Sequence, residues 1–345
     1  MIRVTRFLPR IVLAAIAGAM LACGGGNNST QNGVTDIYIA GDETNDSNME
    51  IAEYWANGTP TVLGAGEYAS AASSIFVSGS DVYVAGVEGS VGKYWKDGTP
   101  VSLTDGTSVV WVNSIFVSGN DVYVAGAELG SGTNRIAEYW KNGVAVKLTD
   151  GTQDAFPWSI YISGTDVYVA GEENDPNTGY SVATYWKNGT PVDLTDGSEL
   201  ALAFSIFVSG SDVYVAGSYC TVFEDNCSIA AYWKNGALVQ LTESTNTYAD
   251  SVLVSGTDVY VAGSSDQSNG FALYWKDGAL TQLGSGSTYS EASQIALSGS
   301  DIYVAGTNYL SGPFDVAGYW KNGAFVSLTD GTHFAEASGI AVVQH

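Results

Sequence analysis

One short sequence occurs seven times along this chain, and that repetition constrains the fold more than any other feature. The phrase Asp-Val-Tyr-Val-Ala-Gly, or a close variant of it, begins at residues 36, 81, 121, 166, 212, 258 and 301. A Tyr-Trp pair follows each copy, with the Trp at positions 55, 95, 140, 186, 233, 275 and 320. Successive Trp residues are 40 to 47 positions apart. This period is too long for leucine-rich or ankyrin units and suits a unit of four short strands.

Each repeat divides into two hairpins. In the second repeat, residues 74–85 form two β-branched and aromatic segments separated by Gly79-Ser80, and residues 92–103 form two more separated by Asp97-Gly98. The second turn is Asn-Gly in five repeats and Asp-Gly in the other two. Both dipeptides favour the turns with positive φ that join antiparallel strands. The repeat therefore predicts four antiparallel strands.

Seven such units resemble a seven-bladed β-propeller, and the resemblance covers residues 36–345. The repeats lack the Trp-Asp and Gly-His marks of WD40 blades and the paired glycines of kelch, so no named family is indicated. The chain opens on a second strand at Asp36 to Ala40 and ends on a first strand at Ser338 to Val343. We therefore expect an all-β fold in which the C-terminal strand completes the opening blade and closes the ring.

The first 22 residues have the features of an export signal. Arg3, Arg6 and Arg10 form a basic start, and residues 11–22 are apolar or small but too few to span a bilayer. The segment ending Met20-Leu21-Ala22-Cys23 resembles the lipobox of bacterial lipoproteins, although Met20 stands where Leu is usual. The resemblance implies a signal peptide over residues 1–22, acyl chains such as palmitate on Cys23 and a flexible tether over residues 23–35. It also implies anchoring at the outer membrane or cell surface, with plain secretion as the alternative.

Cysteine usage and charge agree with export. Beyond Cys23 the chain has Cys220 and Cys227, whose place within one loop predicts a disulfide, because they lack the Cys-x-x-Cys spacing of a redox site. Removing the signal removes three of the 12 basic residues and none of the 36 acidic ones, which leaves a formal charge of −27. This charge excludes nucleic acid as a partner. It is compatible with cations, cationic polymers or neutral sugars, and also with simple solubility of a surface protein.

The two faces of such a ring differ in sequence. The tight hairpin turns lie on one face, here called the turn face, while the second-to-third-strand loops and the blade-to-blade crossings lie on the other, the loop face. The turns are nearly the same in every repeat, whereas the loops range from residues 87–91 to the longer 218–228. On the turn face each second strand begins with Asp and six of the seven third strands end with Lys, as in Asp81 and Lys96. We expect these residues to form a ring of structural ion pairs.

The loop face carries the candidate ligand-binding residues, because each crossing brings an aromatic residue toward it. Flat apolar rings beside carboxylates suit sugars, and capping of the core is the alternative role. The residues that we assign to ligand binding are Trp111, Trp158, Tyr248, Tyr289 and Phe334.

Acidic residues are also frequent in the loops of this face. Asp42 and Asp46 come closest to a calcium-binding spacing, but no loop matches a calcium motif, so a solvated loop is the favoured interpretation. We expect no other cofactor.

Catalytic groups are scarce. The mature chain has two histidines, His333 and His345, and one arginine, Arg135, which excludes a sialidase-like site with several clustered arginines. No Ser-His-Asp order is evident, and we assign no catalytic residues. We therefore expect a monomeric, surface-anchored binding propeller rather than an enzyme, with carbohydrate or protein as its ligand. An envelope scaffold that docks other membrane proteins is the alternative, and a glycosidase or lyase with paired carboxylates is a remote one.

Overall fold

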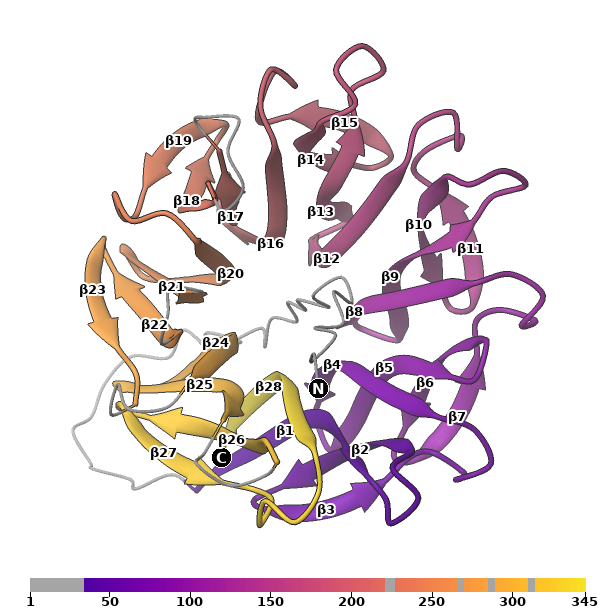
Figure 1. The fold of residues 1–345 in the computed structure, drawn as a ribbon, viewed down its shortest axis with the longest axis vertical. Helices are drawn as coiled ribbons and strands as arrows, with labels where there is room; N and C mark the ends of the chain where they lie inside the picture. The colour runs from indigo at the N-terminus through magenta and orange to yellow at the C-terminus, as the bar shows by residue number, and fades with distance from the viewer. Residues whose placement is uncertain (1–33, 221–226, 266–269, 285–288, 310–313) are drawn as a thin grey trace, which may run out of the picture.

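The computed structural model of the chain describes residues 34–220, 227–265, 270–284, 289–309 and 314–345. The expected signal peptide and Cys23 lie outside these residues. The described residues form seven four-stranded antiparallel sheets, arranged as blades around one axis (Figure 1). The expectation of a seven-bladed propeller is thus confirmed.

Each blade has a first strand beside the axis and three more strands toward the rim (Figure 1). The first strands are β4 (Ser70–Ser78), β8 (Val110–Ser118), β12 (Ala155–Ser163), β16 (Ala201–Ser209), β20 (Thr247–Ser255), β24 (Ser290–Ser298) and β28 (Ala335–Gln344). The second strands are β1 (Thr35–Thr44), β5 (Asp81–Glu88), β9 (Asp121–Leu129), β13 (Asp166–Asn174), β17 (Asp212–Tyr219), β21 (Asp258–Ser265) and β25 (Asp301–Asn308). The third strands are β2 (Glu50–Ala56), β6 (Val91–Lys96), β10 (Arg135–Lys141), β14 (Ser181–Lys187), β18 (Ile229–Lys234), β22 (Phe271–Lys276) and β26 (Val316–Lys321). The fourth strands are β3 (Thr59–Val62), β7 (Thr99–Ser102), β11 (Val144–Lys147), β15 (Thr190–Asp193), β19 (Ala237–Gln240), β23 (Ala279–Gln282) and β27 (Ala324–Ser327).

The ring closes through blade 1, which combines both ends of the chain. Its strand order is β28-β1-β2-β3, and Ile39 in β1 lies opposite Ile340 in β28. Figure 1 shows the yellow β28 beside the indigo β1. Blades 2 to 7 each use four consecutive strands, from β4–β7 to β24–β27. This closure, predicted from the sequence, leaves no first strand without its partner in the blade.

The Asn-Gly turn is nearly invariant because its side chain is part of the sheet. At Asn142 and Gly143 the φ angles are 51° and 81°, in the left-handed region that Asn and Gly tolerate best. Asn142 Oδ1 accepts a hydrogen bond from Val122 N at 2.8 Å, and Asn142 Nδ2 donates to Asp121 Oδ1 at 2.8 Å. The turn therefore fixes the start of the second strand as well as its own hairpin.

The repeated Tyr-Trp pair fills the space between blades. All seven Trp side chains of the pair are at most 1 % exposed, for example Trp95 and Trp320. The adjacent Tyr, such as Tyr94, is half-buried on the opposite face of the same strand. These positions pack the core between neighbouring blades.

Every first strand begins earlier than its alternation pattern indicates. The sequence placed the start of the second blade near Ser74, whereas β4 begins at Ser70 with a register shift between Ala72 and Ser74. The shift is a β-bulge, which interrupts the alternation that marks a strand in sequence. Trp111, Trp158 and Tyr248, expected in crossings, consequently lie within first strands near the loop face.

In five of the seven blades, a serine after the bulge connects neighbouring blades. Ser74 Oγ accepts a hydrogen bond from Ile115 N of the next blade at 3.2 Å, and the same contact recurs around the ring. The other Ser acceptors are Ser114, Ser159, Ser205 and Ser251, at 3.1 to 3.3 Å from their donors. In blade 7 the acceptor is Gln294, and in blade 1 the equivalent position is Gly339.

Candidate functional site

The inner rim of the loop face is divided into an aromatic part and an acidic part. One position of the first strand, just before the bulge, shows the division because strand register identifies it in every blade. From blade 3 to blade 6 it holds Trp111, Phe156, Leu202 and Tyr248, and in blades 7, 1 and 2 it holds Glu291, Glu336 and Ala71. The scaffold is repeated, but the chemistry of its rim is not.

The aromatic part is a continuous row, called here the aromatic arc: Trp111, Phe156, Trp158, Phe204 and Tyr248. Ring centroids along this row are 6.0, 4.5, 5.5 and 6.5 Å apart, in tilted or edge-to-face arrangements. The three central side chains are buried, with Trp158 only 6 % exposed, whereas the terminal Trp111 and Tyr248 are half-buried. The terminal rings are therefore the members best able to contact a ligand.

Arg135 joins the aromatic arc to the carboxylate of Asp154. Its Nε lies 3.0 and 3.1 Å from the two carboxylate oxygens of Asp154, and its guanidinium lies 4.5 Å from the Phe156 ring centroid. Burial raises the pKa of Asp154. Hydrogen bonds from the Arg135 side chain and backbone, together with the Arg135 charge, lower it by more, so the pKa lies below its ordinary value. Asp154 therefore carries a paired negative charge beside the arc. The sequence singled out Arg135 only for its rarity.

Glu172 lies behind the aromatic arc. It is 5 % exposed and accepts a hydrogen bond from Trp158 Nε1. Burial raises the pKa of Glu172 to about 8, although the Trp158 hydrogen bond and the Arg135 charge both lower it. Glu172 is thus largely protonated at neutral pH and fixes the orientation of the Trp158 indole. The sequence alone does not distinguish Glu172 from the other acidic residues near the loop face.

Opposite this row lies the acidic arc, formed by Asp42, Glu50, Glu291, Asp315 and Glu336 of blades 7 and 1. Burial first and the charges of neighbouring carboxylates second raise the pKa of Glu336 to about 7 and that of Asp315 to about 6. Burial and the charges of Glu336, Glu50 and Glu53 raise the pKa of Asp42 well above its ordinary value. Crowding of like charges makes this part of the rim a strong acceptor for hydroxyl groups or cations.

Two of the predicted ligand-binding residues, Tyr289 and Phe334, lie beside the acidic arc rather than in the aromatic one. Tyr289 donates a hydrogen bond to Glu291 Oε1 at 2.5 Å, and its ring centroid is 4.7 Å from that of Tyr309. Phe334 is 46 % exposed and packs edge-on against Phe314 at 4.8 Å. The structure thus groups Trp111, Trp158 and Tyr248 in one arc and places Tyr289 and Phe334 outside it.

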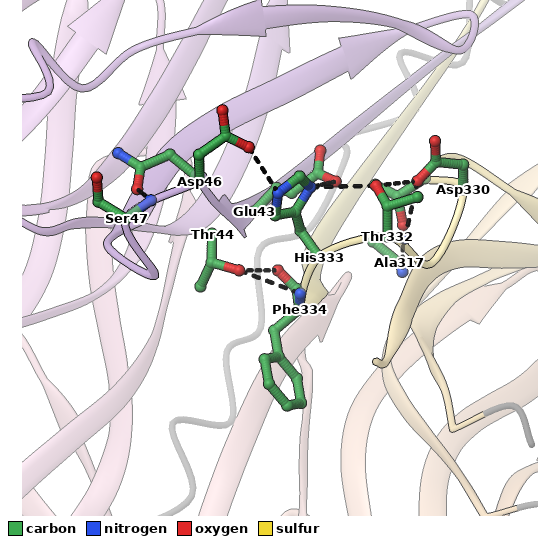
Figure 2. A network of polar contacts seen from close by, with 11 residues as sticks. Glu43, Thr44, Asp46, Ser47, Ala317, Asp330, Thr332, His333 and Phe334 are labelled. Atoms are coloured by element: carbon green, nitrogen blue, oxygen red, sulfur yellow. Dashed lines mark hydrogen bonds and ion pairs between the residues drawn. The ribbon is translucent and has the colours of Figure 1, made fainter. Parts of the chain in front are cut away.

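Asp46, one of the two predicted calcium ligands, belongs to a polar network around His333 (Figure 2). His333 Nε2 lies 3.2 Å from Asp46 Oδ1, and its Nδ1 lies 3.1 Å from Thr332 Oγ1 (Figure 2). This network ties the β1–β2 loop to the crossing from blade 7. Across the described ranges, no group of three or more His, Cys, Asp or Glu side chains is arranged to hold a metal ion. Calcium binding by Asp42 and Asp46 stays a prediction.

Grooves between blades also open on this side of the ring. A groove of about 520 Å³ is lined by residues 193–196 and 198–201 of one blade crossing and by Tyr219 and Cys220 of the next blade. A second groove, of about 410 Å³, lies one blade earlier and includes Asp150, Glu173 and Trp186. Shallow inter-blade grooves therefore accompany the axial rim as places for a ligand.

The predicted disulfide and ion pairs are present. Cys220 and Cys227 form a disulfide, with Cα atoms 5.1 Å apart. On the turn face Lys96 Nζ lies 2.7 Å from Asp81 Oδ2, and the five other Lys–Asp pairs are 2.8 to 3.0 Å long. Blade 1 has no Lys at this position, and there His345 Nε2 lies 2.9 Å from Asp36 Oδ2. Among the described residues, no helix is long and apolar enough to cross a membrane.

The chain is a seven-bladed propeller, and solved structures with similar folds are known. It aligns with a puromycin hydrolase (S511A mutant complexed with PGG) at a TM-score of 0.58 and 9 % identity, over 86 % of this chain and 52 % of that one. For a puromycin-hydrolyzing peptidase of Mycobacterium tuberculosis the TM-score is 0.51 and the identity 12 %, over 85 % and 51 %. For the acylaminoacyl peptidase of Pyrococcus horikoshii the values are 0.53 and 11 %, over 86 % and 50 %.

This chain spans about half the length of those peptidases. At such low identity the likeness concerns the fold alone. No protein-family profile matches the chain. No curated protein sequence matches it either.

Proposed function

We propose that this protein is a non-catalytic binding propeller, held at the cell envelope by a lipid on Cys23, whose loop face takes a carbohydrate ligand. One observation carries the proposal: equivalent rim positions hold aromatic side chains in blades 3, 4 and 6 but carboxylates in blades 7 and 1. The core and turn positions of the same blades scarcely vary. Variation confined to one face of a repeated scaffold is how such folds form a binding surface.

The chemistry of the rim suits a hydroxyl-rich ligand. Trp111 and Tyr248 are half-buried at the two ends of the aromatic arc, where a sugar ring can stack on them. Glu336 and Asp315 supply carboxyl groups that accept or donate hydrogen bonds near neutral pH, because their pKa values are raised to about 7 and 6. Shallow half-exposed rings favour weak individual sites. We therefore expect affinity to rise when several sugars are displayed together.

A non-catalytic role is supported by how the carboxyl groups are arranged. Asp154 is occupied by Arg135, and Glu172 is buried against Trp158. Neither is free to act on a substrate in the manner of a glycosidase acid or nucleophile. In the acidic arc, burial first and neighbouring carboxylates second raise the pKa values of Glu336 and Asp315 together, to about 7 and 6, rather than separating an acid from a base.

A glycan array tests the proposal. Residues 23–345 with Cys23→Ser would be screened in calcium and in chelator, beside Trp111→Ala, Tyr248→Ala and the turn-face control Lys141→Ala. We expect selective binding that both loop-face variants lose and the control retains. Binding that is lost in chelator would indicate a metal ion at the acidic arc. A blank array in both buffers would overturn the carbohydrate proposal, and crosslinking on intact cells would then test a scaffold that docks proteins.

A further inference from the structure

The position where the chain enters the propeller sets how the ring is presented at a membrane. Val34 O accepts a hydrogen bond from His345 N at 3.0 Å, and Thr35 lies opposite Gln344 in the register of β1 and β28. Thr35 Oγ1 is also 3.4 Å from Ser298 Oγ, at the end of the first strand of blade 7. The entry point therefore lies among the ends of first strands, close to the axis.

The same contacts place the entry point on the turn face. Asp36 occupies the position that Asp81 and its equivalents occupy in the ring of ion pairs, and Asn57 of the blade 1 turn donates to Asp36 Oδ1 at 2.8 Å. Val34 is 67 % exposed there. Val34, the first residue of the described part of the chain, consequently lies near the middle of the turn face and not at the rim of the disc.

We infer that the turn face is the membrane-proximal face of the anchored protein and that the loop face, with both arcs, points away from the membrane. This inference rests on the proposed lipid at Cys23. It assigns to the turn face an apposed lipid surface, without insertion into it.

The length of the tether decides between the two orientations. Val34 lies eleven positions after Cys23, so a random-coil tether of that length has a root-mean-square reach of roughly 17 to 20 Å and an extended limit of roughly 40 Å. Facing the loop face to the membrane would require a path from the axis to the rim and then across the thickness of the ring. The distance from the axis to the rim exceeds a radius of gyration of roughly 19 Å. Crossing the thickness of the ring, which is the length of a nine-residue first strand, adds roughly 30 Å to the path. Even a fully extended tether is too short for that path.

The chemistry of the turn face fits close apposition without adhesion. Each of its six Lys residues is 44 % exposed but paired with an Asp, and each stands 5.0 to 5.2 Å from a Tyr ring centroid. Paired charges give no net attraction to anionic lipid. Lipid attachment, and not this surface, therefore holds the protein to the membrane, and the unacylated protein should not bind vesicles.

Energy transfer to the membrane tests the orientation. The full chain, expressed with its signal and reconstituted into vesicles of phosphatidylethanolamine and phosphatidylglycerol, would carry one added cysteine for a maleimide dye. Asn120→Cys lies in the β8–β9 turn on the turn face, and Thr133→Cys lies in the β9–β10 loop of the same blade on the loop face. Transfer to a headgroup-labelled lipid should be at least about twofold greater from position 120, since roughly 30 Å of strand separates the faces.

Two further measurements separate the possible failures. Mass spectrometry of the N-terminal peptide, with flotation of Cys23→Ser as control, reports acylation; absence of acyl mass overturns both the anchor and the orientation. Equal or reversed energy transfer from an acylated protein overturns the orientation and leaves the anchor standing. Inserting about 40 Gly and Ser residues after Gly26 roughly doubles the reach and should reduce the difference between the two labels; an unchanged difference would show that something other than the tether orients the ring.

Discussion

Gln294 Oε1 accepts a hydrogen bond from the backbone N–H of Ile340 at 2.6 Å, across the seam where β28 closes the ring. Five other seams use a serine for this contact. The longer Gln side chain lies over Gly339, where an added Cβ would lie 3.3 Å from its oxygen. Gln294 and Gly339 are therefore a matched pair. At the closing seam, Gln accepts the inter-blade hydrogen bond that serine accepts at five other seams.

Removing this contact should weaken the closed ring. Gln294→Ala leaves the Ile340 N–H buried without its acceptor, and we expect a loss of about 1 to 3 kcal/mol in the free energy of unfolding. Urea denaturation measures the loss, with Ser78→Ala on the turn face as control. An unchanged urea midpoint in Gln294→Ala would mean that the hydrogen bond at the seam contributes nothing to the stability of the ring.

The Gln294 and Gly339 pair should also show coupling. Gly339→Ser alone crowds the Gln294 oxygen, and Gln294→Ser alone shortens the reach to Ile340. The double variant restores the serine pattern of the other blades. Its destabilisation should be smaller than the sum of the two single effects, by about 1 kcal/mol in a double-mutant cycle; strict additivity would contradict the pairing.

Turn chemistry should matter more than the ion pairs beside it. Asn142→Ala places Ala at a φ of 51° and removes the bond to Val122 N, so we expect a loss of about 1 to 3 kcal/mol. Lys141→Ala, one residue earlier, removes an exposed ion pair and should cost less than about 1 kcal/mol. Equal losses in urea denaturation would refute this ranking.

Stability should decline as pH rises toward neutrality. Burial raises the pKa of both Glu53 and Glu138 to about 7, with smaller contributions from Glu43 and Glu128. A carboxyl group whose pKa is raised by folding contributes most stability below its unfolded pKa, and that contribution is lost as pH rises through the folded value. Between pH 4.5 and 7, we expect a decline of about 1 to 2 kcal/mol per group.

Blade 2 supplies the variant that checks this pH dependence. There Lys93 stands where blade 3 has Glu138, and it forms an ion pair with Glu88, the counterpart of Glu128. Glu138→Lys should therefore reduce the loss of stability between pH 5 and pH 8, measured by urea denaturation, whereas Glu199→Lys on the surface should not. A decline of full size in Glu138→Lys would exclude Glu138 as its source.

The disulfide should stabilise only the loop that it closes. Cys220 and Cys227 close a loop of eight residues, for which loop-closure entropy predicts about 2.5 kcal/mol. Replacing both by Ser should lower the unfolding free energy by no more than that amount and leave ligand binding by the aromatic arc intact. Detection of free thiols in the oxidised Cys23→Ser protein would show instead that the bond does not form.

The repeat made the fold predictable, because strand and turn positions that are ambiguous in one copy are clear when seven copies are compared. The Asn-Gly turns, the Asp–Lys pairs and the closing strand from Ser338 followed from it directly. The inter-blade serines could not be predicted, because a Ser such as Ser74 next to a bulge looks in sequence like any strand residue. Their role depends on which backbone N–H faces them from the next blade.

The candidate site was harder to predict, because it too depends on strand register and on contacts between blades. The β-bulge shifts the register by one residue, so Phe156 and Trp158 occupy different positions although both are aromatic residues near a blade crossing. Sequence alone therefore suggested one ring of equivalent aromatics, whereas the structure shows an aromatic arc and an acidic arc. The pairing of Arg135 with Asp154 joins two blades and has no signature within either repeat.

The most direct test of the account is calorimetric titration of a multivalent glycan from the array into three proteins: the Cys23→Ser protein, its Trp111→Ala and Tyr248→Ala double variant, and its Lys141→Ala control. A loop-face lectin predicts that the double variant loses at least about tenfold in affinity, since each stacked ring contributes about 1 kcal/mol, while the control binds as before. Equal affinity in all three proteins, or loss only in the turn-face control, would contradict the claim that the loop face binds the ligand.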